Sequence, residues 1–403
     1  MNADIKQRAD RVIASTYSRF PVVLTHGKGC NLYDEEGKKY IDFLAGIAVC
    51  NLGHSHPRVC EALKKQADIL FHVSNLFYTM PQVELAEKLV QQSFADRVFF
   101  CNSGAEANEA CIKLARKFFH DKGESNRFRI ISMKKSFHGR TMGTLSATGQ
   151  DKIRAGFEPV LGGFDFVPFD DVQAVRNAIT PDTCAVMLEP IQGEGGVRCP
   201  EADYLRSVRK ICDEAGILLI FDEIQTGIGR TGKLFAYEHS GVTPDIMSLA
   251  KALGNGLPIG AMLATERTAK AFTPGAHAST FGGTPLITAA ALEVLKVIEE
   301  ENIVESCKRT GGYFREKLLL LKEKYSIIRD VRGMGLLLGM ELAVNGKPIV
   351  DQCLENGFII NCIQDYILRF VPPLIISREE IDLLVTCLDT ILGRIQMENA
   401  RSF

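Results

Sequence analysis

From about Val98 onward, short apolar runs alternate with amphipathic stretches, and this alternation constrains the fold of the 403-residue chain more than any other feature. The apolar runs are VFFCN, RIISM, CAVMLEP and ILLIFDE. Their apolarity is continuous rather than alternating, which is typical of strands covered on both faces. Residues 103–119 and 204–215 instead place apolar side chains at helical spacing. Strands that alternate with helices predict an α/β fold with an open, mainly parallel sheet.

The two ends of the chain have a different pattern. Roughly the first 45 residues predict a short helix and an extended arm with turns at 26–29 and 35–37. From about Leu295, long charged helices precede β-rich stretches such as GMGLLLGMEL, which predicts a smaller α+β domain. We therefore expect an N-terminal arm that contributes to the small domain (1–50), a large domain (51–294) and a C-terminal small domain (295–403).

Composition argues against several classes of function. Lys plus Arg (47) nearly balance Asp plus Glu (49), unlike the global basic surface of a nucleic-acid-binding protein. No apolar run reaches ~18 residues, the length of a membrane span, and the N-terminus lacks the apolar core of a signal peptide. The 12 cysteines contain no C-x-x-C pair and predict buried thiols in a reducing compartment. We therefore expect a cytoplasmic protein with no nucleic-acid or membrane partner.

The first motif with chemical potential is CNSGAEANE (101–109), where an apolar run leads through Ser103, Gly104 and Ala105 into a helix. The free N–H groups of a helix's first turn bind anions, and glycine allows a phosphate to approach the backbone closely. A plain helix N-cap explains the same residues equally well. The motif alone therefore does not decide between a phosphate site and a cap.

Two further motifs place ionisable residues at the ends of apolar runs. Asp222 ends ILLIFD and is followed by Gln225 in a turn, whereas Lys251 ends the next run before a glycine-rich turn. Their separation of 29 residues (251 − 222) is one strand–helix–strand step, so both are expected at the carboxyl edge of the sheet, where such sheets bind ligands. A desolvated lysine can form a Schiff base. The alternatives are an Asp that caps the next element and a lysine that reaches solvent.

A fourth motif, KSFHGRTMGTLSATG (135–149), contains Phe137, which either stacks on a planar ring or belongs to the core. A phosphate cradle, a strand-end Asp, a strand-end Lys and a stackable aromatic ring are the protein groups that pyridoxal phosphate needs.

Two other motifs give only weak evidence for a binding site. GIGRTGK (227–233) matches nucleotide-binding strings, but no Ser or Thr follows its lysine and no strand directly precedes it. His54 and His56 flank a turn with no third metal ligand nearby, which favours a loop role.

Together these motifs resemble the class III aminotransferases, pyridoxal-phosphate enzymes of fold type I, over nearly the whole chain. SGAEANE, FHGRT, EPIQGEGG, FDEIQTGIGRTG, SLAKALGNGLPIGAM and STFGG occur in the family's order. GIAVCNLGHSHP and SNLFYTMPQ are most similar to the subgroup that acts on N2-acetylornithine. Ile47 stands where ornithine aminotransferases carry a Tyr that contacts the substrate, which points away from free ornithine.

The resemblance implies transfer of the terminal amine of N2-acetylornithine to 2-oxoglutarate, with pyridoxal 5'-phosphate as cofactor, in arginine biosynthesis. The products would be N-acetylglutamate semialdehyde and glutamate. Other ω-amino donors stay open: ornithine, succinylornithine, succinyldiaminopimelate and 4-aminobutyrate. So does an aminomutase or racemase that does not use 2-oxoglutarate. A binding protein with an inactive site is a further class, against which the intact Lys251 and Asp222 argue.

The resemblance also implies a role for each matching residue. The expected catalytic residues are Lys251 and Asp222. The expected cofactor-binding residues are Ser103, Gly104, Ala105, Phe137, Asp222, Gln225, Lys251 and Thr280. The expected substrate-binding residues are Arg140, Glu194, Arg369 and Ser279.

In this scheme Glu194 masks Arg369 while the ω-amine donor is bound. The alternative for Arg369 is that it only ties the domains together. Relatives form homodimers in which the STFGG string contributes to the partner's cofactor site, so Thr280 is expected to act across an interface. No metal ion is expected.

Overall fold

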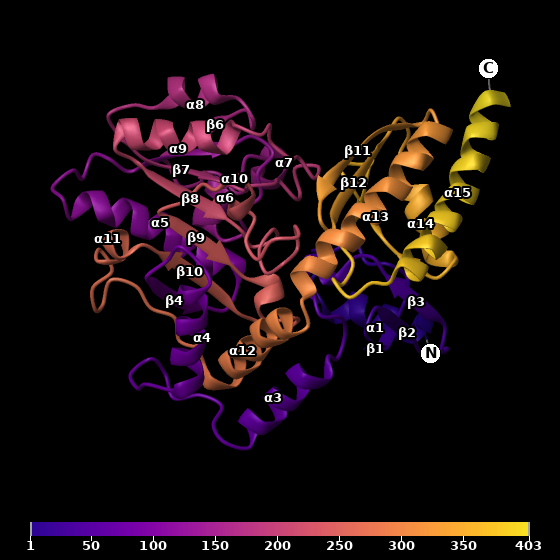
Figure 1. The fold of residues 1–403 in the computed structure, drawn as a ribbon, viewed down its shortest axis with the longest axis horizontal. Helices are drawn as coiled ribbons and strands as arrows, with labels where there is room; N and C mark the ends of the chain where they lie inside the picture. The colour runs from indigo at the N-terminus through magenta and orange to yellow at the C-terminus, as the bar shows by residue number, and fades with distance from the viewer. Residues whose placement is uncertain (1, 402–403) are drawn as a thin grey trace.

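The computed structural model describes residues 2–401, and its largest element is a seven-stranded sheet (Figure 1). The strand order is β4-β10-β9-β8-β7-β5-β6. The strands are β4 (Arg97–Cys101), β5 (Arg129–Met133), β6 (Phe164–Val167), β7 (Thr183–Leu188), β8 (Leu218–Asp222), β9 (Ile246–Leu249) and β10 (Gly260–Ala264). Neighbouring strands are parallel from β6 to β9, whereas β10 is antiparallel to both β9 and β4. The predicted α/β fold with a mainly parallel sheet is confirmed.

Helices cover both faces of this sheet, which explains the continuous apolarity of its strands. Along β8, Leu218 and Ile220 pack with α5 (Gly104–His120) on one face. Leu219 and Phe221 pack with α9 (Tyr204–Ala215) on the other. Burying each such side chain contributes roughly 1.5–3 kcal/mol, so both faces must stay covered. The helix predicted at 204–215 has these bounds in the structure.

Two four-stranded sheets and their helices lie beside the central sheet, on the right in Figure 1. One joins β1 (Leu24–Lys28), β2 (Asn31–Asp34) and β3 (Lys39–Asp42) to β13 (Phe358–Ile359). The other contains β11 (Ile328–Met334), β12 (Leu337–Leu342), β15 (Ile367–Phe370) and β14 (Asn361–Ile363). The N-terminal arm is thus hydrogen-bonded to a strand more than 300 residues later in the chain.

The remaining helices are mostly short. They are α1 (Asn2–Val12), α2 (Ala45–Ala48), α3 (Pro57–Ala67), α4 (Met80–Gln91), α6 (Met142–Ala147), α7 (Asp151–Arg154), α8 (Val172–Ala178), α10 (Tyr237–Ser240), α11 (Glu266–Ala269), α12 (Pro285–Glu300), α13 (Ile303–Lys324), α14 (Lys347–Glu355) and α15 (Arg378–Arg401). The expected boundary between residues 294 and 295 falls inside α12, which packs against α3 and α4.

The turn predicted at 26–29 occurs at 29–30 instead, so of the predicted residues only Gly29 lies in it. Residues 24–28 form β1, and the hairpin turns at Gly29 and Cys30, where Gly29 has a φ of 58°. Such a left-handed position favours glycine. Gly27 lies inside the strand for a different reason, because a Cβ there would come within 2.9 Å of His54 Cβ.

All 12 cysteines are free, and seven of them are buried. Within residues 2–401, no helix is long and apolar enough to cross a membrane. The same residues contain no group of three or more His, Cys, Asp or Glu side chains that could hold a metal ion.

Candidate active site

Nine of the twelve predicted site residues line one cavity of about 400 Å³ at the carboxyl edge of the central sheet. Asp222 ends β8, and Lys251 begins the 3-10 turn η1 (Lys251–Leu253) just after β9. The two strands are parallel neighbours, with Asp222 paired to Ser248, so both side chains reach the same edge. The other seven are Ser103, Gly104, Ala105, Phe137, Arg140, Glu194 and Gln225. A larger cavity of about 520 Å³ lies along β4 and β10, but none of these residues lines it.

The N-terminus of α5 forms one end of this cavity. Ser103 is the N-cap, and its Oγ accepts a hydrogen bond from Glu106 N at 3.2 Å. The N–H groups of Gly104 and Ala105 lie in the first turn, where an α-helix offers them no acceptor. A Cβ on Gly104 would lie 2.8 Å from Ile224 Cδ1, so a larger residue here would push the Ile224 side chain aside. Free N–H groups and the positive end of the helix dipole suit a phosphate.

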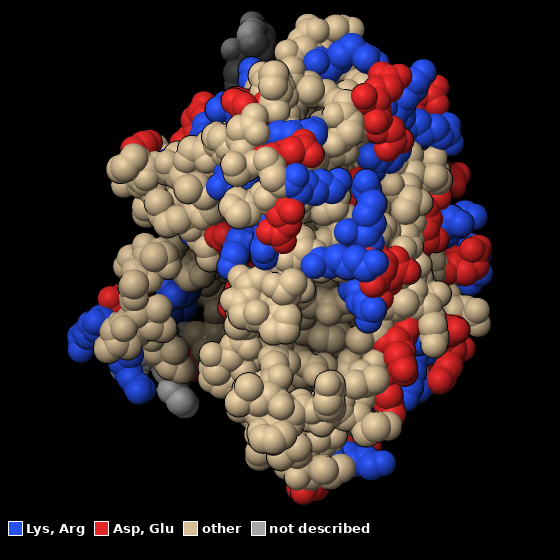
Figure 2. Space-filling model, turned by 90° about the vertical axis from the view of Figure 1, so that its left-hand side faces the viewer, with Lys and Arg blue, Asp and Glu red and all other residues tan. Residues whose placement is uncertain are grey.

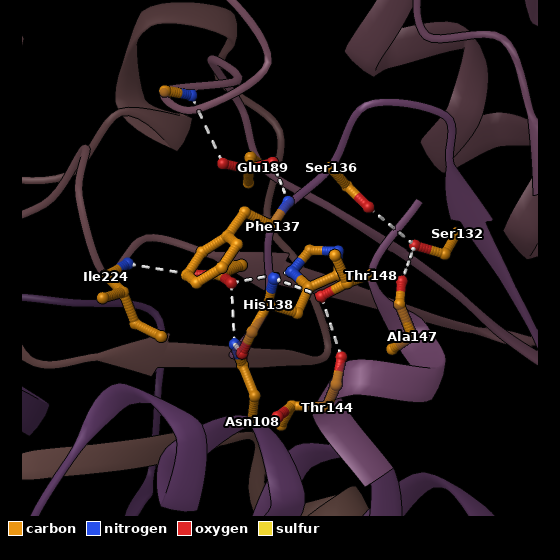
Figure 3. Close-up of polar contacts among 12 residues, drawn as sticks. Asn108, Ser132, Ser136, Phe137, His138, Thr144, Ala147, Thr148, Glu189 and Ile224 are labelled. Atoms are coloured by element: carbon orange, nitrogen blue, oxygen red, sulfur yellow. Dashed lines mark hydrogen bonds and ion pairs between the residues drawn. The ribbon is translucent and has the colours of Figure 1, made fainter. Parts of the chain in front are cut away.

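The carboxylate of Asp222 is buried and has three hydrogen-bonding partners, Asn108, His138 and Ile224, which are labelled in Figure 3. Its Oδ2 accepts a hydrogen bond from Asn108 Nδ2 at 2.7 Å and pairs with His138 Nδ1 at 2.8 Å. Its Oδ1 accepts a hydrogen bond from Ile224 N at 3.0 Å. These contacts fix the orientation of the carboxylate at the cavity wall. A buried carboxylate of this kind is suited to a cationic partner such as a protonated ring nitrogen.

Lys251 combines backbone strain with desolvation. Its φ of 43° is left-handed, a conformation that costs a non-glycine residue about 1 kcal/mol or more. Burial lowers the pKa of its amine, and the charge of Glu194 only partly opposes this effect. Because a neutral amine is the nucleophilic form, this lysine is suited to attack a carbonyl carbon.

Two arginines supply positive charge at the cavity. One is covered by an ion pair and the other is open. Arg369, on β15, is 1% exposed; its Nη1 forms an ion pair with Glu194 and lies 3.5 Å from Gln225 Oε1. Burial raises the pKa of Glu194, but the positive charge of Arg369 outweighs it and keeps the pKa below its usual value. Arg140 lines the cavity with its guanidinium carbon 5.8 Å from the centre of the Phe137 ring, and no hydrogen bond or ion pair to it occurs within residues 2–401.

Asn108, His138 and Glu189 are site residues that the sequence interpretation missed. Glu189 follows β7 and accepts hydrogen bonds from Phe137 N at 3.2 Å and Gly193 N at 3.3 Å (Figure 3). Burial, together with the charge of Asp222, raises the pKa of Glu189 well above its usual value. The available signals were a polar Asn108 on the apolar face of α5 and a His next to Phe137 in the FHGRT string.

Ser279 and Thr280 lie outside this cavity. Their loop lines a separate cavity of about 490 Å³, and Thr280 is exposed. Ser279 is linked to the catalytic cavity indirectly, because its Oγ accepts a hydrogen bond from Asn102 Nδ2 at 3.1 Å and Asn102 lines both cavities. A single chain therefore does not bring Thr280 to its own Lys251.

The two weaker motifs have structural contacts. Arg230, in GIGRTGK, is fully buried and donates hydrogen bonds to Leu336 O, Pro372 O and Asn51 Oδ1. Its string thus joins distant segments of the chain. His54 Nε2 pairs with Asp42 Oδ2 at 2.7 Å.

Comparisons with known proteins agree with this geometry. Residues 12–392 match the family described as Aminotransferase class-III. The chain is 54% identical to an acetylornithine aminotransferase of Methanocaldococcus jannaschii, covering 94% of this chain and 96% of that protein. It is 49% identical to an acetylornithine aminotransferase of Aquifex aeolicus, covering 94% and 99%.

Solved structures are similar over almost the whole chain. The ornithine aminotransferase of Toxoplasma gondii has a TM-score of 0.95 at 35% identity, covering 99% of this chain and 96% of that one. The acetylornithine aminotransferase of Elizabethkingia anophelis has a TM-score of 0.87 at 35% identity, covering 98% and 99%.

The cavity contains a matching group for each part of pyridoxal 5'-phosphate. A desolvated amine suits the aldehyde, a buried carboxylate suits the ring nitrogen, an aromatic ring suits the ring face, and a helix N-terminus suits the phosphate. The chain belongs to the class III aminotransferases, pyridoxal-phosphate enzymes that transfer amino groups between small molecules.

Proposed function

We propose that this enzyme transfers the terminal amine of N2-acetylornithine to 2-oxoglutarate, giving N-acetylglutamate semialdehyde and glutamate. The two arginines, one masked and one open, are the observation that carries this proposal. The identities of 54% and 49% to the acetylornithine aminotransferases of M. jannaschii and A. aeolicus support this donor.

Each cavity residue is assigned to one part of the cofactor. In this proposal Lys251 binds it covalently, Asp222 faces the ring nitrogen, Phe137 stacks on the ring and Gln225 faces the 3-oxygen. Ser103, Gly104 and Ala105 hold the phosphate. Bound there, the cofactor supplies an aldehyde that accepts the amine and a ring that withdraws electrons from the reacting carbon.

Lys251 and Asp222 then have distinct chemical tasks. Once the donor amine has displaced it from the cofactor, the free Lys251 Nζ would take a proton from the reacting carbon of the substrate and would deliver it to the cofactor carbon that receives the amine. The Asp222 carboxylate keeps the ring nitrogen protonated, because a negative charge in a water-poor site favours the cationic form of its neighbour. Asn108 and His138 hold that carboxylate in place.

The two arginines allow one cavity to serve two substrates of different charge pattern. The terminal amine of N2-acetylornithine reacts far from its carboxylate, so the reacting end needs no cation. 2-Oxoglutarate reacts beside a carboxylate, and that carboxylate needs Arg369. We propose that Glu194 covers Arg369 in the first half-reaction and moves aside in the second, while Arg140 binds the distant carboxylate in both.

We also propose a homodimer in which Thr280 of each chain completes the partner's site. Large apolar side chains are exposed on the connection between α3 and α4 and on the Thr280 loop: Leu76 (84%), Phe77 (65%), Tyr78 (98%) and Phe281 (61%). Asn75 Nδ2 binds the loop through Ser279 O and Gly282 O. Figure 2 shows a broad area without charged side chains low on this side of the molecule. Exposed apolar patches of this kind are typical of protein interfaces.

A panel of amino donors tests the proposed reaction. The purified holoenzyme is assayed for glutamate with N2-acetylornithine, N2-succinylornithine, ornithine, succinyldiaminopimelate or 4-aminobutyrate. We expect the highest kcat/KM with N2-acetylornithine and no turnover without 2-oxoglutarate. A higher kcat/KM with another donor would contradict the substrate, and conversion of more than one equivalent of donor per active site without 2-oxoglutarate would contradict the reaction class.

A further inference from the structure

One hairpin contacts both partners of the Arg369–Glu194 ion pair. β14 and β15 pair antiparallel, with Asn361 opposite Arg369. The Oδ1 of Asn361 accepts a hydrogen bond from Arg369 Nε at 3.3 Å. The Nε2 of Gln364, in the turn of the same hairpin, donates to the backbone oxygen of Glu194 at 3.2 Å. The arginine and the backbone of its masking residue are therefore held from one element.

The turn is strained at the residue that reaches Glu194. Gln364 has a φ of 51° and Asp365 a φ of 64°, and both are exposed. Tight turns with left-handed positions favour Gly, Asn or Asp, so a glutamine is an unexpected occupant. Residues with strained backbone conformations cluster at functional sites. A glycine at position 364 could not make the hydrogen bond to Glu194, because that bond comes from the glutamine side chain.

The loop that carries Glu194 is rich in glycine. Glu194 lies between Gly193 and Gly195, and Gly196 has a φ of 113°. Glycine lowers the conformational restriction of the backbone, so a side-chain contact from outside has a large influence on the loop's position. Gln364 makes such a contact from the neighbouring hairpin.

Arg369 depends on the hairpin in a different way. Its side chain is almost fully buried, so each N–H group needs an acceptor inside the protein. When Glu194 leaves Nη1, a substrate carboxylate can replace it, whereas Asn361 would remain the acceptor for Nε.

We propose that the β14–β15 hairpin determines dicarboxylate specificity, with Gln364 holding Glu194 over Arg369 and Asn361 holding Arg369 ready for a carboxylate. This inference rests on the proposed function, in which Glu194 masks Arg369. Both are positioning residues, since they act through the ion pair. Their removal has opposite effects: loss of the Gln364 amide favours the open arginine, and loss of the Asn361 oxygen weakens it.

Binding of glutarate to the holoenzyme tests this inference, because glutarate has both carboxylates of 2-oxoglutarate but no keto group and cannot react. We expect Gln364→Met, which keeps the length and removes the donor, to lower the Kd of glutarate about threefold in calorimetric titrations. We expect Asn361→Leu to raise it about tenfold, with Asn361→Ala as a second variant if the first does not fold. The KM for 2-oxoglutarate should change in the same directions.

Two further variants separate the possible outcomes. Tyr366→Phe is the matched control, since its side chain is 49% exposed in the same hairpin, and it should leave the Kd unchanged. Glu194→Ala should lower the Kd if the masking role is correct, and an unchanged Kd would contradict the proposed function itself. If Glu194→Ala lowers the Kd but the two hairpin variants shift it in the same direction, or not at all, the hairpin inference is overturned.

Discussion

Asp222 illustrates how neighbouring side chains orient a single buried carboxylate. Its Oδ2 has two side-chain partners, Asn108 and His138, that lie 114 and 84 residues away in the chain. In an environment that excludes water, a fixed negative charge is worth far more than in solvent. In the proposed function, the charge of Asp222, rather than its hydrogen bonds alone, is therefore the property that the reaction needs.

Asp222→Asn tests this at the residue scale. The amide keeps the shape but loses the charge, so we expect cofactor binding to persist and the rate of the first half-reaction to fall roughly 10²–10³-fold or more. Stopped-flow absorbance with N2-acetylornithine measures the rate, and the cofactor content is measured separately. Asp203→Asn, with an 83% exposed side chain, is the control. A near-normal rate would remove Asp222 from the mechanism.

The sequence predicted the residues that stand at strand ends and missed those that support them. Lys251 and Asp222 stand out because charged residues directly after apolar runs need an explanation. Asn108 looks like a polar interruption of a helix face, and Glu189 like an acid before a proline. Only the folded structure shows that Asn108 contacts Asp222 and that Glu189 contacts Phe137 N at the wall of the cavity.

At the scale of elements, the central strands and α9 could be predicted because burial on both faces leaves a strong pattern in the sequence. The arm could not be predicted equally well. In the sequence Gly27 is typical of a turn. In the structure a small residue is needed there because a Cβ would clash with His54, which is 27 residues away in the chain. A tertiary contact of this kind has no local signal.

The contact between His54 and Asp42, in the N-terminal arm, also contributes to the stability of the folded protein. Burial lowers the pKa of His54, but hydrogen bonds with Asp42 and Cys50 outweigh it and raise the pKa to about 9. Because the folded-state pKa lies above the unfolded value of ~6.5, the stabilisation is complete below pH 6.5 and is lost as the pH rises through 9.

We therefore expect the free energy of unfolding to fall by roughly 2–3 kcal/mol between pH 6.5 and pH 9.5 through this histidine. Denaturant unfolding of the wild type and of His54→Gln at both pH values measures its share. The difference between the two proteins should shrink at the higher pH. A constant difference would show that the His54 charge does not contribute.

At the scale of the whole molecule, Arg230 joins parts of the chain that are far apart in sequence. It binds the backbone oxygens of Leu336 and Pro372 and the side chain of Asn51. Burial lowers its pKa to about 10, so it remains charged at neutral pH. Removing it leaves three buried acceptors without their donor.

We expect Arg230→Met to lower the free energy of unfolding of the holoenzyme by roughly 3–5 kcal/mol, because unsatisfied buried acceptors cost more than an apolar side chain regains. Arg206→Met is the control, since the Arg206 side chain is 60% exposed. Denaturant unfolding compares the two. Equal stability of both variants would show that Arg230 is not needed to join these segments.

The proposed dimer can be tested by mixing two inactive variants, Lys251→Ala and Thr280→Glu. If the sites are shared, a heterodimer has one complete site, made by Lys251 of the Thr280→Glu chain and Thr280 of the other. Random exchange should then restore roughly a quarter of the wild-type activity, since half of the dimers are mixed and each has one good site. No recovery after confirmed exchange would mean that each chain builds its site alone.

Borohydride reduction of the holoenzyme tests the location of the active site most directly. Reduction fixes the cofactor to the amine that holds it, and peptide mass spectrometry identifies that residue. We expect the modification on Lys251, the strained and desolvated lysine between β9 and the glycine-rich turn. We expect none in a folded Lys251→Ala variant. Modification of any other lysine in the wild-type enzyme would contradict the assignment of this cavity as the catalytic site.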